Sequence, residues 1–235
     1  DSLVGIFAIG QKPGGDKDPF GLRRAALAVL RIIVENRLAL DLVDLCHAAA
    51  AGYQNGDIDA EAVIDDVIEY VFDRMRAYYE EQGVRFDIVD SVIHRRSGKL
   101  YDCELRILAV QAFQQHEAAA ALAAANKRIS NILKKQTLET ADVKPDLLHE
   151  SAERELFQQL QSRQASVAEH VNAGNYADAL QQLAELRPHV DLFFDEVMVM
   201  SEDEALKVNR LALLELLLQN FRQIADFSRI QSSAA

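Results

Sequence analysis

The sequence is organised around one segment, Ala123-Ala-Ala-Asn-Lys-Arg-Ile-Ser-Asn-Ile-Leu-Lys-Lys135. At 3.6 residues per helical turn, its apolar side consists of Leu122, Ala125, Ile129, Ile132 and Leu133. The opposite side consists of Lys127, Arg128, Asn131, Lys134 and Lys135. This pattern predicts an amphipathic helix with a packed face and a cationic face. The cationic face is a candidate surface for a polyanion, although charge is also typical of a helix face that is simply solvated.

The composition is that of a globular protein. Of the 235 residues, 49% are hydrophobic and 26% are charged, which suffices for one or two domains with packed cores. No apolar run approaches the roughly 20 residues that cross a bilayer, and no secretory signal pattern opens the sequence. We therefore expect a cytoplasmic protein without a membrane partner. Because the chain begins at Asp1 and continues into apolar residues, we expect it to be a piece of a longer polypeptide.

The formal net charge is −12, and the charges are unevenly distributed. Between Asp57 and Glu81 there are nine acidic residues and two arginines, so this segment should avoid nucleic acid. The basic segment 123–135 stands out against this background. Because affinity for RNA follows the local patch rather than the total charge, the sequence predicts localised binding.

No constellation typical of catalysis or metal binding is present in the sequence. Cys46 and Cys103 lack Cys-x-x-Cys spacing, so we expect two buried free thiols and no metal site. The adjacent carboxylates of Asp65 and Asp66 would point about 100° apart on a helix, without a histidine partner. Residues 10–17 resemble a phosphate-binding loop but lack its lysine position, so we interpret them as a turn.

The periodicity predicts an all-α chain of packed helix pairs, with no strand pattern. Helices are expected over residues 19–37, 40–51, 57–82 and 86–96, from 100 into the basic segment, and over 151–173, 176–186 and 201 onward. Asp18 should cap the first of these, and Ser201 with Glu204 should form a capping box at the last. Residues 137–145 are expected to form a surface loop.

Three packing details are also expected. The helix over 57–82 should bury Val63, Val67, Val71, Met75 and Tyr78. The apolar run 211–218 should lie in the middle of a bundle. Asn209 and Arg210, just before that run, should be structural partners of the acids between residues 191 and 204.

Three groups of motifs resemble the carboxy-terminal part of the β subunit of bacterial glycyl-tRNA synthetase. The first is Leu3-Val-Gly-Ile-Phe7 with Gly15-Asp-Lys-Asp-Pro-Phe20 and Leu22-Arg-Arg-Ala-Ala-Leu27. The second is Asn126-Lys-Arg-Ile-Ser-Asn-Ile-Leu133. The third is Phe194-Asp-Glu-Val-Met-Val-Met-x-Glu-Asp203 with Asn209-Arg-Leu-Ala-Leu-Leu214. Together they cover the start, middle and end of the chain.

This resemblance implies an all-α helical bundle with a C-terminal anticodon-binding (DALR-like) domain. Residues 1–115 would follow an upstream HD-type domain, and residues 116–235 would form the anticodon-binding domain. The chain would be a non-catalytic part of an α2β2 glycine–tRNA ligase, a class II aminoacyl-tRNA synthetase. ATP and magnesium would act at the α subunit, and no cofactor would bind in this chain. The implied partners are tRNA for glycine and the α subunit, with no DNA.

The candidate tRNA-binding residues follow from the resemblance and the charge pattern. Lys127, Arg128, Lys134 and Lys135 would bind phosphates, and Asn126 and Asn131 would contact bases. Arg23, Arg24, Arg95, Arg96 and Lys99 are further candidates along the limb of the tRNA. For each of them, a solvated or internally paired charge is the alternative.

Two other functions stay open at this point. A helical interaction scaffold is suggested by the acidic faces and by Gly174-Asn-Tyr-Ala-Asp-Ala-Leu180, which resembles half of a tetratricopeptide repeat. A phosphohydrolase of the HD type would need an upstream domain and metal ligands that this sequence does not supply. The scaffold predicts no salt-dependent affinity for tRNA, and the hydrolase predicts a bound divalent metal.

Overall fold

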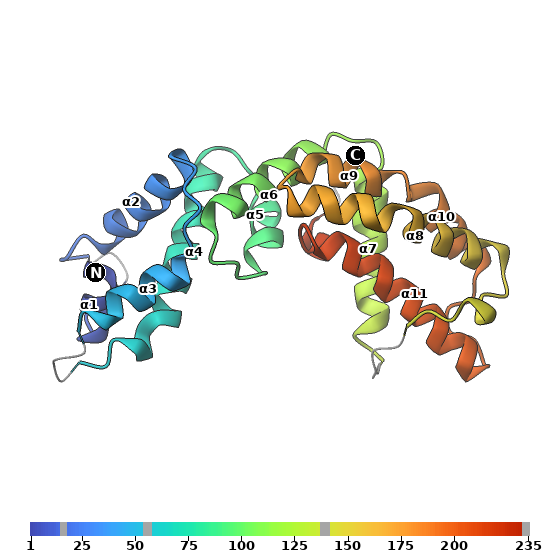
Figure 1. Cartoon of the computed structure of the whole chain (residues 1–235), viewed down its shortest axis with the longest axis horizontal. Coiled ribbons are helices and arrows are strands. Elements are labelled where there is room, and N and C mark those ends of the chain that lie inside the picture. Colours follow the sequence, from blue (N-terminus) through green and yellow to red (C-terminus); the bar gives the residue numbers. More distant parts are fainter. Residues whose placement is uncertain (15–17, 54–57, 137–141, 232–235) are drawn as a thin grey trace. The chain divides into compact units, whose positions relative to one another are not determined.

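A computed structural model describes residues 1–14, 18–53, 58–136 and 142–231. Within these ranges the chain forms eleven α-helices, three short 3-10 helices and no strand, which confirms the all-α prediction. The contacts divide the chain into two compact units, Asp1–Leu105 and Arg106–Ala235. The division falls inside α6 (Leu100–Phe113), and the boundary predicted after residue 115 lies in the turn that follows this helix (Figure 1).

The first unit is built around α4 (Ile64–Glu81). This helix packs against the other helices of the unit, which are α1 (Ser2–Ala8), α2 (Leu22–Glu35), α3 (Leu42–Ala51) and α5 (Phe86–Ile93), and a 3-10 turn, η1 (Glu61–Val63), precedes it. The predicted stripe of α4 is confirmed at Val67, Val71 and Met75 and is wrong at its ends. Ile64 and Tyr79 are buried, whereas Val63 and Tyr78 are only half-buried. Val63 lies in the 3-10 turn before the helix, and Tyr79 rather than Tyr78 falls four residues after the buried Met75.

Helix α2 starts later than predicted because of a glycine. Gly21 has φ 66°, in the left-handed region, so the chain cannot run as a helix from Pro19 through this position. Gly21, not Asp18, is the N-cap residue, but the Asp18 carboxylate does accept hydrogen bonds from the first-turn N–H groups of Leu22 (2.7 Å) and Arg23 (3.0 Å). Burial alone would raise the pKa of Asp18, but these bonds and the nearby arginine charges hold it below its usual value.

The second unit packs its helices around α11 (Glu204–Arg222). Its other helices are α7 (Ala119–Leu133), α8 (Ser151–Asn172), α9 (Tyr176–Ala184) and α10 (Arg187–Glu196), with 3-10 turns η2 (Pro145–Leu147) and η3 (Phe227–Arg229). Helix α11 contacts α7, α8, α9 and η2. It buries Leu211, Leu213, Leu214, Leu217 and Leu218. This burial confirms the predicted central position of the run 211–218.

The start of α11 differs from the predicted capping box. Asp203, not Ser201, is the N-cap, and its carboxylate accepts hydrogen bonds from the N–H groups of Ala205 (2.9 Å) and Leu206 (3.2 Å). The Ser201 hydroxyl accepts one from the N–H of Asp203 instead. Both residues are good N-caps, and the aspartate captures two of the free N–H groups of the first turn.

The polar residues at the start of the apolar run pair with unexpected partners. Arg210 Nε lies 2.5 Å from Glu153 Oε1 on α8, and both side chains are buried. Arg210 also donates to the carbonyl oxygen of Met198 at 2.9 Å. Asn209 bonds to the backbone N–H and C=O of Lys144. The predicted partnership with the acids between 191 and 204 is therefore wrong for the contacts described, because the nearest buried carboxylate comes from another helix.

Several other expectations meet the structure as follows. Cys46 and Cys103 are free and buried, as predicted, and burial raises the pKa of the Cys46 thiol. Within the described ranges, no helix is long and apolar enough to cross a membrane. The helix predicted from residue 57 is wrong over residues 58–63, because residues 58–60 are irregular, residues 61–63 form η1 and α4 begins at Ile64. The turn predicted over 10–17 and the loop predicted over 137–145 lie partly outside the described residues.

Candidate nucleic-acid interface

The cationic face of α7 is present as predicted. Its side chains are exposed at Lys127, Arg128, Asn131, Lys134 and Lys135. On the packed side, Leu122, Ala123 and Ile129 are buried. The helix begins with a run of small alanines and packs against η3, α11 and α10, which hold it in place. The face is thus a row of four cations and one amide, carried by the last turns of α7 and by the two residues that directly follow it.

Asn126 is a correction to the predicted base-contacting set. Its side chain is 1% exposed, and its Nδ2 donates to the Leu122 carbonyl one turn earlier at 2.9 Å. It lies on the packed stripe because it falls four residues after Leu122 and three before Ile129. A buried amide cannot present its edge to a base on this face. Ile132 and Leu133, predicted to be packed, are only half-buried, and Ser130 is buried in their place.

A hollow adjoins the cationic face of α7. It has a volume of about 460 Å³ and is lined by Arg128, Asn131, Ile132, Lys135, Gln136 and Met200. The Arg128 guanidinium lies over the ring of Phe194 on α10, with 4.0 Å from Cζ to the ring centroid. Met198 and Met200, in the segment after α10, are both exposed. Charged, amide and apolar groups therefore converge on one open depression.

Three residues at this place are not among the predicted site residues: Met200 and Gln136, which line the hollow, and Phe194, whose ring lies under the Arg128 guanidinium. Phe194 and Met200 lie more than sixty residues from α7 and reach it only through the tertiary fold. The available signal was that both residues belong to a motif, 194–203, that was used for the resemblance but assigned no role. Gln136 is the first residue after the basic segment, where an amide beside four cations is a plain candidate.

The hollow has the chemistry expected of a site for an unstacked base. Its volume lies within the roughly 300–1,000 Å³ typical of ligand pockets. A guanidinium held over an aromatic ring offers a surface on which a base can stack, and the thioether of Met200 adds apolar contact. Asn131 and Gln136 offer donors and acceptors for base edges. Lys127 and Lys134 extend the cationic face beyond the hollow, where phosphates would lie.

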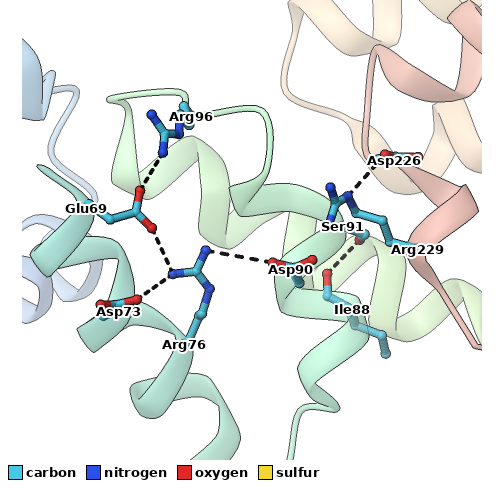
Figure 2. A network of polar contacts seen from close by, with 9 residues as sticks. All are labelled: Glu69, Asp73, Arg76, Ile88, Asp90, Ser91, Arg96, Asp226 and Arg229. Carbon is cyan, nitrogen blue, oxygen red and sulfur yellow. Dashed lines mark hydrogen bonds and ion pairs between the residues drawn. The ribbon is translucent and has the colours of Figure 1, made fainter. Parts of the chain in front are cut away.

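The basic cluster at 95–99 lies in the first unit and is engaged in part. Arg96 Nη2 lies 2.9 Å from Glu69 Oε2, and Glu69 also pairs with Arg76 (Figure 2). Arg76 in turn bonds to Asp73 at 2.7 Å, also in Figure 2. Arg95 and Lys99 are exposed. The Arg96 guanidinium is therefore engaged in an ion pair within the first unit.

Arg23 and Arg24 lie elsewhere in the first unit. They line a small hollow between α2 and α4, together with Arg74. Of the carboxylates considered for catalysis, Asp66 pairs with Lys12. Among the described residues, no group of three His, Cys, Asp or Glu side chains is arranged to hold a metal ion.

Comparison with known proteins gives the class of the second unit. The family model described as the DALR anticodon binding domain matches residues 122–231, which run from α7 through η3. This helical unit with its basic face is therefore an anticodon-binding domain of the DALR class. A second family model, described as the glycyl-tRNA synthetase beta subunit, matches residues 1–94.

Relatives along the whole chain agree with both models. The glycine–tRNA ligase beta subunit of Hahella chejuensis is 48% identical over 236 residues, covering 100% of this chain and 34% of the relative. That of Serratia proteamaculans is 51% identical over 232 residues, covering 98% and 34%. The chain belongs to the glycyl-tRNA synthetase β-subunit family. It spans about a third of the length of these relatives.

Proposed function

We propose that this chain is the tRNA-recognition part of a glycine–tRNA ligase β subunit and that the α7 face binds the anticodon arm of tRNA for glycine. The observation that carries the proposal is the convergence of Arg128, Asn131, Lys135 and Met200 on one hollow within the DALR anticodon-binding domain. Anticodon bases are unstacked in a loop, and a protein can read them only by offering both stacking planes and edge partners. The hollow supplies both kinds of group.

In this proposal the role of each residue follows from the chemistry of its side chain. Lys127 and Lys134 neutralise phosphates, which fixes the arm without reading its sequence. Arg128 keeps its place over Phe194 and stacks on a base, and Asn131 and Gln136 bond to that base or its neighbour. Glycine anticodons share two cytosines, and the cytosine edge has one amino donor and ring acceptors that suit an amide.

The similarity to glycine–tRNA ligase beta subunits extends the proposal to the rest of the enzyme. The α subunit would be the partner of this β subunit in an α2β2 enzyme and would carry the chemistry that uses ATP and magnesium to activate glycine. Arg95 and Lys99 would contribute weaker phosphate contacts from the first unit. The site of action would be the cytoplasm, where tRNA is charged.

The proposal is tested by fluorescence-anisotropy binding of the chain to a glycine tRNA over a series of salt concentrations. The variant Lys127→Ala/Arg128→Ala should bind more weakly, and the slope of log affinity against log salt should fall by about one for each lost phosphate contact. Arg31→Ala/Arg222→Ala removes the same charge from exposed ion pairs with Glu35 and Glu215, so it should bind like the unaltered chain.

A tRNA altered at its two anticodon cytosines distinguishes contacts to the bases from contacts to the phosphates. The unaltered chain should prefer the natural tRNA, and Asn131→Ala should lose this preference while keeping its salt slope. Equal affinity of the α7 double variant and the unaltered chain would remove this face from the interface. Absence of tRNA binding even at low salt would favour the interaction scaffold.

A further inference from the structure

The sulfur-containing side chains are distributed unequally between the core and the surface. The sequence contains three methionines and two cysteines, and all five lie within the described ranges. Met75, Cys46 and Cys103 are buried, whereas Met198 and Met200 are 74% and 48% exposed. An oxidant that reaches this protein from solvent therefore meets two thioethers of one short segment before it meets a thiol.

The fold keeps both exposed methionines at the surface. Val197 and Val199 are buried, so buried and exposed side chains alternate along the segment. The Met198 carbonyl oxygen accepts a hydrogen bond from the buried Arg210 at 2.9 Å. The segment cannot turn its methionines into the core without losing the packing of the two valines and this hydrogen bond.

Met200 differs from Met198 in what surrounds it. Met200 lines the hollow beside α7 together with Arg128, Asn131 and Lys135, and Met198 is not part of this lining. As a thioether, Met200 gives the hollow a polarizable apolar wall. As a sulfoxide, it would carry a polar oxygen that accepts hydrogen bonds from the guanidinium of Arg128 or the ammonium of Lys135. One added oxygen would thus remove an apolar contact and occupy donors of the same hollow.

We propose that Met200 is a site of reversible oxidation by hydrogen peroxide and that its sulfoxide form binds tRNA more weakly. This inference rests on the proposed function, because it concerns the regulation of the same hollow. Met198 is oxidised as well, but its sulfoxide lies outside the hollow and leaves tRNA binding unchanged.

The chemistry is a two-electron oxygen transfer. The thioether sulfur donates an electron pair to one oxygen of the peroxide, and the O–O bond breaks. The second oxygen leaves as hydroxide and takes the proton of the first, so the products are the sulfoxide and water. The cations of the hollow favour this step, because they stabilise the negative charge that develops on the leaving oxygen. A methionine sulfoxide reductase reverses the change, releasing the oxygen as water while two thiols are oxidised to a disulfide.

The test compares the 235-residue chain before and after treatment with hydrogen peroxide. Peptide mass spectrometry should show oxygen added at Met198 and Met200 but not at Met75, and far-ultraviolet circular dichroism should show that the helices persist. The affinity for a glycine tRNA, measured by fluorescence anisotropy, should fall about two- to tenfold, the size expected for loss of a thioether contact with an aromatic ring. Methionine sulfoxide reductases should restore the affinity.

Met200→Leu and Met198→Leu form a matched pair, because each removes one oxidisable side chain from the same segment and keeps the position apolar. Peroxide should leave the affinity of Met200→Leu at its own value before treatment. It should weaken binding by Met198→Leu as much as binding by the unaltered chain. An equal loss in both variants, or an unmodified Met200 beside a fully oxidised Met198, would overturn the proposal.

Failure of this inference is distinguishable from failure of the proposed function. If the untreated chain binds glycine tRNA and binds it equally well after complete oxidation of Met200, only the regulatory role of Met200 is overturned. If the untreated chain does not bind the tRNA at low salt, the proposed function is overturned and the regulatory role falls with it.

Discussion

Replacing Arg210 by methionine should strongly destabilise the second unit. The Glu153 side chain is fully buried, and that of Arg210 is 6% exposed, with 2.5 Å between Nε and Oε1. Removal of one partner leaves a buried charge uncompensated, which typically costs about 3–5 kcal/mol. At about 2–4 °C per kcal/mol for a chain of this size, the midpoint of thermal unfolding should fall by roughly 6–20 °C.

Arg210→Met should also affect the hollow beside α7. Arg210 donates to the carbonyl of Met198, two residues before Met200 in the segment that contributes to the hollow. Without that bond, Met200 is held less firmly against Arg128 and Asn131. Arg210→Met should therefore weaken tRNA binding at temperatures where the protein is still folded, with the salt slope unchanged because no phosphate contact is lost.

The assay for stability is far-ultraviolet circular dichroism, because the chain is helical and contains no tryptophan. Arg222→Met, which breaks an exposed pair on the same helix, should cost at most about 1 kcal/mol. Glu153→Met/Arg210→Met should recover part of the loss, because no buried charge remains. The recovery is incomplete because Glu153 Oε2 also accepts a hydrogen bond from the Glu150 N–H at the start of α8 (2.8 Å). A loss below about 1 kcal/mol for Arg210→Met alone would refute the reasoning, since it would mean that the Glu153 carboxylate is solvated or protonated at no cost.

Two further changes test features of the fold. Burial raises the pKa of the Glu104 carboxyl, so the unfolded chain releases that proton at lower pH than the folded protein. The free energy of unfolding therefore falls as the pH rises from the unfolded-state pKa of Glu104 to its folded-state pKa. Measured by urea unfolding, Glu104→Gln should be more stable than the unaltered chain at neutral pH, and the difference should vanish below about pH 4. A difference that does not change with pH would show that it does not come from the ionisation of Glu104. Gly174 links α8 and α9 with φ 75°, so Gly174→Ala should cost about 1–2 kcal/mol by the same measurement, and no loss would show that the turn relaxes.

The fold and the exposed face of the candidate interface could be predicted from local sequence. The face of α7 follows from the 3.6-residue period alone, because Lys127, Arg128 and Lys134 fall opposite Leu122 and Ile129. Asn126 obeys the same period, and its position between Leu122 and Ile129 on the packed side decides its burial, whatever its amide could offer to a base. A polar residue at a core position of an amphipathic helix is evidence for a buried side chain before it is evidence for a contact.

The remainder depended on contacts that no local pattern encodes. Glu153 and Arg210 are distant in sequence, and their pairing requires α8 and α11 to be packed together. The stacking of Phe194 on Arg128 likewise depends on where α10 meets α7. At the start of α11, Ser201 and Asp203 are both acceptable caps, and only the path of the preceding segment selects the aspartate.

The burial of both cysteines has a practical and a chemical consequence. A thiol reacts as its thiolate, and Cys46 combines a buried position with a pKa that burial raises, so it should resist alkylation and oxidation. Cys103 is also buried and makes a weak bond to the Ser97 carbonyl. A single cysteine introduced at the exposed Lys134 position should therefore accept a fluorescent label selectively. The binding of the proposed tRNA partner could then be followed in real time without removing either native cysteine.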